Sequence, residues 1–164
     1  MKFIADVMLG KLAKRLRLLG VDVLYEPGLQ DNEIIRRSLE QDRIILTRDR
    51  SLSQRPLAAR HVLISSEHLH DQFEQMLKTF SSILDPATFL TRCSVCNEIL
   101  KAASKQEVRD LVPAYVYDRS NSFLRCSCCG RVYWKGNHVR NLIQSGFAEQ
   151  NRKTLRGAGQ TRKG

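Results

Sequence analysis

The pattern of apolar and polar positions over the first 90 residues alternates between strand-like and helix-like periods. Residues 2–7 form a short apolar run that ends near Asp6, residues 21–25 alternate, and residues 61–64 form another short run. Residues 43–47 contain three consecutive apolar side chains, Ile44, Ile45 and Leu46, which is typical of a strand covered on both faces of a parallel sheet. These runs predict four strands of an α/β domain.

Three helices are expected between and after these strands. Residues 9–19 carry an apolar stripe at helical spacing that ends before Gly20, and residues 67–80 carry another. A third helix is expected between them, from an N-cap at Asp31 to about residue 41. Its inward side chains are predicted to be Ile34, Ile35 and Leu39. The polar face of the first helix consists of Lys11, Lys14, Arg15 and Arg17.

Composition favours a globular protein over a disordered or membrane-spanning one. Hydrophobic residues make up 42% of the 164 residues, and no run approaches the roughly 20 apolar residues that cross a bilayer. Asp6 and Lys11 interrupt the apolar stretch that a secretory signal would need. We therefore expect a cytoplasmic protein, in which cysteines stay reduced.

The net charge of +10 is concentrated in the second half of the chain. Residues 1–90 contain 13 basic and 12 acidic side chains, whereas residues 91–164 contain 14 basic and 5 acidic ones. This excess of positive charge attracts polyanions, of which nucleic acid is the commonest soluble example. The alternative is that the basic tail, expected to be disordered over residues 146–164, serves only solubility.

Four cysteines form two pairs with the same spacing. Cys93 and Cys96 make one C-x₂-C pair, and Cys126 and Cys129 make the other. Two such pairs predict a closed, structural Zn²⁺ site with four thiolate ligands, and Cys128 is expected to stay outside it. Four ordinary buried cysteines, or a redox pair, are the alternatives. The change of character near residue 90 predicts one domain over residues 1–90 and a zinc ribbon over residues 91–145.

Acidic residues stand where the predicted strands end. Asp6 closes the first strand, Asp49 follows the third, and Asp31 opens the helix after the second. Ligands of open parallel sheets bind at this edge, and converging carboxylates repel one another unless a cation neutralises them. We therefore predict a Mg²⁺ or Mn²⁺ site with Asp6 and Asp49 as metal ligands. Asp71, near the start of the last helix, is the predicted fourth acid.

Each acid also has a simpler explanation. Asp31 could be only a helix cap, Asp49 could begin a turn, and Asp6 could pair with Arg48. Glu33 and Glu67 are the alternatives for the fourth acid. A metal held by these acids would polarise a phosphodiester bond while nearby cations hold the polyanion. The cations predicted to contact nucleic acid are Lys11, Lys14, Arg15 and Arg48.

Two unrelated sets of motifs resemble one family. The runs FIADVMLGKLAKRLRLLG at residues 3–20 and RIILTRD at residues 43–49 resemble the PIN-like ribonuclease domain at the C-terminus of the nematode mutator exonuclease. The two cysteine pairs and the run YWKGNH at residues 133–138 resemble the zinc ribbon of that family. The resemblance covers residues 2–142 in order.

The resemblance implies a PIN-like three-layer α/β/α fold with a mostly parallel sheet, followed by the zinc ribbon. It also implies a metal-dependent ribonuclease, and it maps the family's acids onto Asp6, Asp49 and Asp31, while the fourth acid has no clear match. Tyr133, Trp134 and His138 are predicted to contact RNA. The alternative is that the two aromatic residues pack over the zinc knuckle.

Two other functions fit parts of the sequence. A non-catalytic protein that binds ribosomes or structured RNA needs only the basic half, and its binding would need no divalent metal. A phosphatase-like enzyme fits an Asp at the end of the first strand, but no second Asp follows two residues later. An endoribonuclease with Zn²⁺ and Mg²⁺ or Mn²⁺ is the function we expect. The oligomeric state, including a homodimer, is left open.

Overall fold

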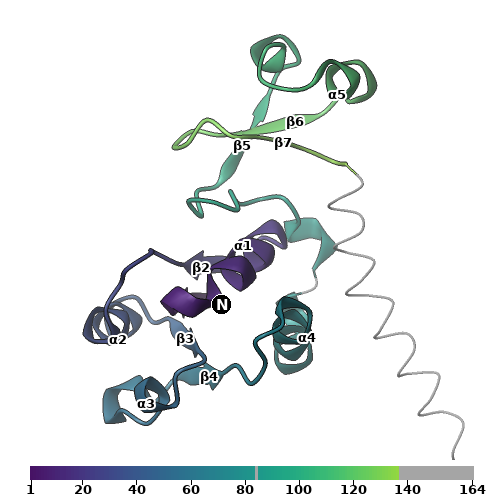
Figure 1. Ribbon diagram of the computed structural model, residues 1–164. Helices are drawn as coiled ribbons and strands as arrows, with labels where there is room; N and C mark the ends of the chain where they lie inside the picture. The colour runs from purple at the N-terminus through teal and green to yellow at the C-terminus, as the bar shows by residue number, and fades with distance from the viewer. Residues whose placement is uncertain (84, 137–164) are drawn as a thin grey trace, which may run out of the picture.

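The computed structural model describes residues 1–83 and 85–136, and it begins with a parallel sheet of four strands (Figure 1). The strands are β1 (Lys2–Ala5), β2 (Asp22–Leu24), β3 (Ile44–Thr47) and β4 (His61–Leu63). They lie in the order β2-β1-β3-β4, and every pairing is parallel. The four predicted strands and the α/β class are therefore confirmed, although each strand is shorter than its apolar run.

Two helices cover one face of this sheet. They are α1 (Gly10–Leu18) and α4 (Leu69–Thr79), which contact each other as well as the strands. Phe3 and Leu46 of the central strands point to this side, where they are buried in one cluster with the apolar stripes of both helices. Burial of a side chain of this size contributes about 1.5–3 kcal/mol, so the cluster is a main source of stability.

The other face is covered by α2 (Asp31–Glu40) and the short helix α3 (Arg50–Ser53). Ile4 and Ile45 point to this side, because successive side chains of a strand alternate between the two faces. Both are completely buried, in a second cluster with the inner residues of the two helices. The domain therefore has three layers, with helices on both sides of the sheet.

Two helical side chains do not lie where the periodicity predicted them. Leu39 was expected in the core, but its residue is 58% exposed at the end of α2. Arg17 was expected on the polar face of α1, but it is only 1% exposed. Its guanidinium group is satisfied by backbone carbonyls outside the helix, which helical periodicity does not reveal.

The connection to the second part of the chain caps the C-terminal end of α1. The backbone N–H of Leu90 donates to the carbonyl of Leu18 at 2.9 Å, and the hydroxyl of Thr88 donates to the carbonyl of Leu19 at 2.7 Å. These bonds satisfy carbonyls that a helix end leaves unpaired. Gly20 follows with φ +86°, and a Cβ atom there would lie 2.1 Å from the backbone oxygen of Thr88. Glycine is the residue that fits this turn.

The second part of the chain forms an antiparallel sheet of three strands. These are β5 (Leu100–Ala103), β6 (Phe123–Cys126) and β7 (Val132–Trp134), in that order. Helix α5 (Ala114–Arg119) lies between β5 and β6 in the chain. Strands β6 and β7 form a hairpin around the second cysteine pair. This sheet lies beyond the α1 and β2 side of the first sheet, away from β4 (Figure 1).

No helix in the described part of the chain is long and apolar enough to cross a membrane. The predicted tail at residues 146–164 and the predicted contact residue His138 lie outside the described residues. Five short 3₁₀ turns complete the described structure: η1 (Val7–Leu9), η2 (Pro56–Ala58), η3 (Ser81–Ile83), η4 (Pro86–Thr88) and η5 (Gln106–Val108).

Candidate functional site

Asp6 lies at the carboxyl edge of the parallel sheet, directly after β1. Its backbone N–H donates to the carbonyl of Leu46 at 2.9 Å, which fixes the residue beside the end of β3. The residue is 5% exposed, and its Oδ2 accepts a hydrogen bond from the hydroxyl of Thr47 at 2.8 Å. Among the described residues no basic side chain forms an ion pair with Asp6, so the alternative pairing with Arg48 is not found. Burial of a carboxylate without a cation is costly.

Asp49 is joined to Asp6 through one hydroxyl group. Thr47, which donates to Asp6, accepts a hydrogen bond from the backbone N–H of Asp49 at 2.9 Å. The side chain of Asp49 caps α3 by accepting from the N–H of Ser51 at 2.7 Å. Hydrogen bonds from the side chain and backbone of Ser51 hold the pKa of Asp49 below its usual value. Asp49 is therefore ionised near neutral pH and is held in place as a helix cap.

Asp31 is the first residue of α2 rather than its N-cap, which is Gln30. The expected capping role is therefore wrong. The Oδ2 atom of Asp31 instead pairs with the guanidinium of Arg55 at 2.9 Å, and the same guanidinium donates to Asn32 at 2.7 Å. The charge of Arg55 also contributes to the lowered pKa of Asp49. Arg55 thus lies close to both acids.

The three acids lie at one edge of the sheet but do not form a tight cluster. In the described residues, Asp6, Asp31 and Asp49 are not among the groups whose ligand atoms all lie within 4.8 Å of one another. Thr47 lies between the first and third of these acids, and Arg55 lies beside Asp31. Such intervening groups relieve the repulsion between the carboxylates. Thr47 and Arg55 were not predicted; the one signal for Thr47 was a polar residue at the end of an apolar strand.

Asp71 lies apart from this arrangement, near the start of α4. It is exposed and accepts a hydrogen bond from the hydroxyl of Ser66 at 2.9 Å. Its ligand atoms lie within 4.8 Å of those of His70 and Glu74, on the surface of the same helix. Exposed groups of this kind are common without a metal, so the role of Asp71 as a fourth acid stays a prediction.

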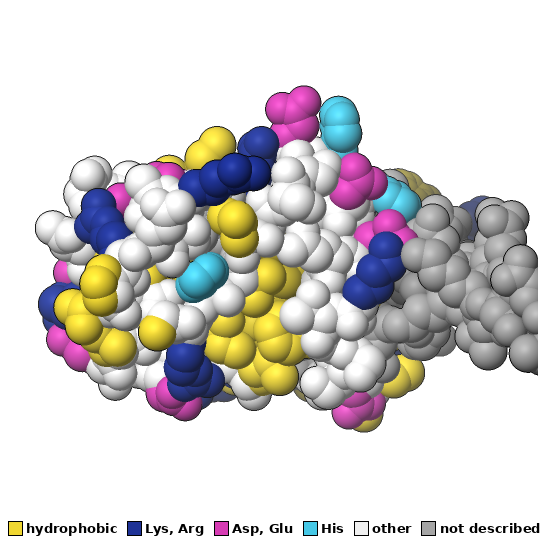
Figure 2. All heavy atoms as spheres, turned by 90° about the horizontal axis from the view of Figure 1, so that it is seen from below, with side chains coloured by type: hydrophobic (Ala, Val, Ile, Leu, Met, Phe, Trp, Pro, Cys, Tyr) yellow, Lys and Arg dark blue, Asp and Glu magenta, His cyan; other side chains and the backbone are white. Residues whose placement is uncertain are grey.

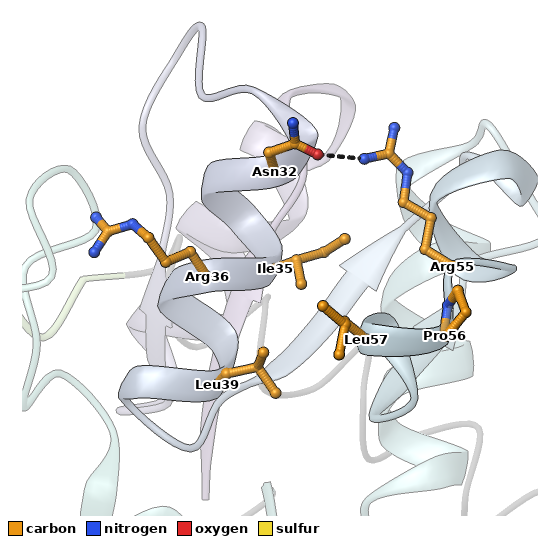
Figure 3. A pocket seen from close by; sticks show the side chains of 7 residues that line it. All are labelled: Asn32, Ile35, Arg36, Leu39, Arg55, Pro56 and Leu57. Atoms are coloured by element: carbon orange, nitrogen blue, oxygen red, sulfur yellow. Dashed lines mark hydrogen bonds between the residues drawn. The ribbon is translucent and has the colours of Figure 1, made fainter.

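An apolar groove opens beside Asp31. Its volume is about 510 Å³, and it lies between α2 and η2. Ile35, Leu39 and Leu57 point toward one another across it (Figure 3). Leu57 is 65% exposed, which is unusual for a leucine and leaves a hydrophobic surface open to solvent. The full lining consists of Asn32, Ile35, Arg36, Leu39, Arg55, Pro56 and Leu57.

The predicted basic contacts lie mainly on α1. Lys11 and Lys14 are exposed, and Lys11 is in the first turn of the helix, next to the carboxyl edge. Arg15 lies with its guanidinium carbon 5.2 Å from the ring centroid of Phe73. Around β4, Lys and Arg alternate with acidic side chains and surround an apolar centre (Figure 2). That face therefore presents no continuous basic surface.

Four cysteine thiols gather between the two sheets. The sulfurs of Cys93, Cys96, Cys126 and Cys129 all lie within 4.8 Å of one another. The distance between the sulfurs of Cys93 and Cys129 is 3.5 Å, and that between Cys96 and Cys126 is 3.3 Å. Tetrahedral Zn²⁺ with its usual bond lengths would separate sulfurs by about 3.8 Å. The donor set and its spacing therefore fit Zn²⁺, and exposed Cys128 is outside the group.

The two cysteine pairs share one backbone geometry. Asn97 donates from its N–H to the carbonyl of Cys93, and Gly130 does the same to Cys126, both at 3.0 Å. Both residues have positive φ, 68° for Asn97 and 73° for Gly130. The residue after each pair is thus in the left-handed region, where Gly and Asn are favoured. Each pair therefore forms a tight turn of the same geometry, called a knuckle below.

Tyr133 supports the first knuckle. Its hydroxyl lies 3.1 Å from the sulfur of Cys93 and accepts from the N–H of Ser94 at 3.1 Å. Burial opposes ionisation of Cys93, but hydrogen bonds from the backbone of Cys96 and from Tyr133 outweigh it and lower the pKa of Cys93 to about 6. Trp134 packs, half-buried, against the core of the second sheet. The packing alternative therefore fits Tyr133, whereas Trp134 packs in a separate cluster away from the cysteines. Contact of either residue with RNA stays a prediction.

Comparison with known proteins gives one positive finding. The model of the family described as Mut7-C RNAse domain matches residues 1–145, which include both sheets and all four clustered cysteines. Neither the curated proteins nor the solved structures contain a match to the chain.

Proposed function

The chain belongs to the family described as the Mut7-C RNAse domain, and on that premise we propose that it is a metal-dependent endoribonuclease. The family supports a nucleic acid as the substrate. The observation that carries the proposal is Asp6, a buried carboxylate at the carboxyl edge of a central strand, without a basic partner among the described residues. A divalent cation would neutralise it.

In this proposal Asp6 and Asp49 would be the residues that hold Mg²⁺ or Mn²⁺. A bound ion of this kind polarises the phosphodiester and lowers the pKa of the attacking water. Thr47 orients the carboxylate of Asp6 through its hydroxyl group. Arg55 and the exposed Lys11 stand close enough to the edge to balance the phosphate charge. The chain itself therefore supplies position and charge around the reacting phosphate.

The groove beside Asp31 suggests where the next nucleotide lies. Apolar walls formed by Ile35, Leu39 and Leu57 would cover a base that has left its stack, and such contacts are tolerant of sequence. Asn32 at the rim offers an amide for the edge of the base. This arrangement favours single-stranded RNA over a duplex, whose bases are not accessible.

The four clustered thiols are proposed to hold one structural Zn²⁺. Four thiolates complete a tetrahedral shell and leave no position for a substrate or a water, so this ion would not take part in cleavage.

The proposal is tested by incubating the purified full chain with single-stranded RNA and Mn²⁺. We expect cleavage that needs the divalent metal, and we expect Asp6→Asn to reduce it at least about 100-fold while the fold is kept. Asp42→Asn is the matched control, because Asp42 is exposed at the opposite edge of the sheet and its left-handed backbone suits Asn. A protein inert on varied RNAs with Mn²⁺ would contradict the proposal.

RNA binding without cleavage is the second candidate, and the charge of the second part of the chain favours it. Residues 91–136 contain eight basic and four acidic side chains. Two results together would support this function instead. The wild-type protein would not cleave RNA, and RNA binding would persist without divalent metal and in the Asp6→Asn variant.

A further inference from the structure

Strand β2 is an outer strand of the parallel sheet, and its open edge is covered by two side chains. The carbonyl of Val23 accepts a hydrogen bond from Nε of Arg17 at 2.8 Å. The N–H of Val23 donates to Oδ1 of Asn97 at 3.2 Å. Both outward backbone groups at the middle of the strand are therefore paired, although none of the strands in residues 1–83 and 85–136 lies beyond this edge.

The same two side chains hold the first cysteine knuckle. Arg17 donates from Nη1 to the carbonyls of Ser94, at 3.2 Å, and Val95, the two residues between the paired cysteines. Asn97 is itself the residue that closes the knuckle. The edge of the sheet and the backbone of the knuckle thus share Arg17 and Asn97 as common partners, across about 75 residues of sequence.

The charges at this contact are also matched. Asp22 of β2 accepts from Arg43 at 2.7 Å and from Nδ2 of Asn97 at 2.8 Å, and Arg92 lies 3.6 Å away. Arg17 is completely buried, and a buried guanidinium is tolerated only with full hydrogen bonding and nearby negative charge. A zinc ion held by the four thiolates would carry a net charge of about −2 and would supply negative charge next to Arg17.

We propose that the metal-bound knuckle closes the β2 edge of the parallel sheet, with Arg17 and Asn97 as positioning residues. An uncovered edge strand is a site for aggregation and local opening, and proteins commonly protect it. Here the protection depends on the metal, because the metal fixes the loop that presents Asn97 and the carbonyls bound by Arg17. The zinc site therefore stabilises the first domain, and this role is independent of whether the protein cleaves RNA.

The opposite edge of the sheet gives an internal comparison. Strand β4 is the other outer strand, and it lies away from the second sheet (Figure 1). Its carbonyl at Leu63 accepts from Nε2 of Gln75 at 2.8 Å, a bond made within the first domain. Loss of the metal should therefore affect β2 and leave β4 protected.

Hydrogen exchange of the full chain, measured by mass spectrometry with and without zinc, tests this proposal. We expect removal of zinc by a chelator to speed exchange at residues 21–25 by about tenfold or more, with less than a twofold change at residues 61–64. Cys96→Ser should behave like the stripped protein, and Cys128→Ser, the cysteine outside the cluster, like the wild type. Unchanged exchange at residues 21–25, or an equal rise at both edges, would overturn the proposal.

Two variants that keep all four thiols separate the edge contact from loss of the metal. Asn97→Gly keeps the left-handed turn but removes the amide, so zinc content should stay the same while exchange at residues 21–25 rises. Arg17→Met removes the hydrogen bonds that Arg17 donates and its positive charge. The affinity for zinc, measured by competition with a chelator, should fall about 10–100-fold, as it does when residues that contact metal ligands are lost. Wild-type exchange in Asn97→Gly would overturn the proposal, and so would wild-type zinc affinity in Arg17→Met.

Discussion

At the scale of single residues, the candidate site depends on one buried threonine. Thr47 donates to Asp6 and accepts from the backbone of Asp49, so it links the carboxylate of Asp6 to the backbone of Asp49. It is completely buried, and its hydroxyl has both a donor and an acceptor role. A side chain of the same shape without the hydroxyl would leave two polar groups unsatisfied.

We therefore predict that Thr47→Val destabilises the protein by about 1–3 kcal/mol and lowers Mn²⁺-dependent cleavage. Urea unfolding gives the stability change. Thr79→Val is the matched control, because the hydroxyl of Thr79 bonds to Gln75 on the exposed side of α4 and its loss should cost within about 0.5 kcal/mol. Equal midpoints for the two variants would contradict this role of Thr47.

A second prediction at this scale compares two glycines that have nearly the same backbone conformation. Gly20 and Gly28 have φ of +86° and +84°, but a Cβ atom meets the backbone of Thr88 only at Gly20 and nothing within 4 Å at Gly28. We expect Gly28→Ala to cost about 1 kcal/mol, from the left-handed backbone alone, and Gly20→Ala to cost at least about 2 kcal/mol. Thermal unfolding of both variants measures the difference, and similar melting temperatures would contradict the tight contact at Gly20.

At the scale of elements, the strands and the main helices of the first domain were predictable because each carries a strong apolar pattern. Strand β3 has three consecutive apolar residues before Thr47, because both of its faces are covered. Arg17 was placed on the wrong side because helical periodicity does not include partners from distant parts of the chain. Leu39 lies at the end of α2 and lines the exposed groove instead of the core. Helix α3 has only four residues, too few to give a period.

The groove between α2 and η2 leads to a prediction at this scale. Leu57→Asp places a charge in the apolar groove, so it should weaken binding of single-stranded RNA at least about fivefold, because one base loses its apolar cover. Fluorescence anisotropy with the Asp6→Asn background avoids cleavage during the measurement. Leu111→Asp is the control, since Leu111 is a similarly exposed leucine in the second part of the chain. Equal affinities in the two variants would exclude the groove from the RNA path.

At the scale of the whole molecule, the sequence predicted the cysteine cluster and the excess of positive charge but not how the two sheets meet. The cysteine pairs were recognisable because their spacing is local, whereas the contact of Asn97 with Val23 joins residues that no sequence period relates. The domain boundary near residue 90 stays a prediction. Of the basic excess after residue 90, only part lies in the described residues, which include eight basic and four acidic side chains up to residue 136.

This charge distribution predicts that RNA binding depends strongly on salt. Each phosphate contact adds about −0.7 to the slope of log K against log [salt] for single strands, so contacts from several basic residues should give a slope of about −3 or steeper. Anisotropy titrations of the full chain between about 50 and 200 mM salt, where the effect is large, measure this slope. A flat dependence would show that the positive charge does not take part in binding.

The proposed function depends on a divalent cation at the carboxyl edge of the parallel sheet, held by Asp6 and Asp49. A crystal of the full chain soaked in Mn²⁺ and measured for anomalous scattering tests this site most directly. We expect an anomalous peak beside the carboxylates of Asp6 and Asp49, next to Thr47, which disappears in Asp6→Asn. A peak confined to the exposed group of His70, Asp71 and Glu74, or no peak at the edge of the sheet, would contradict this metal site.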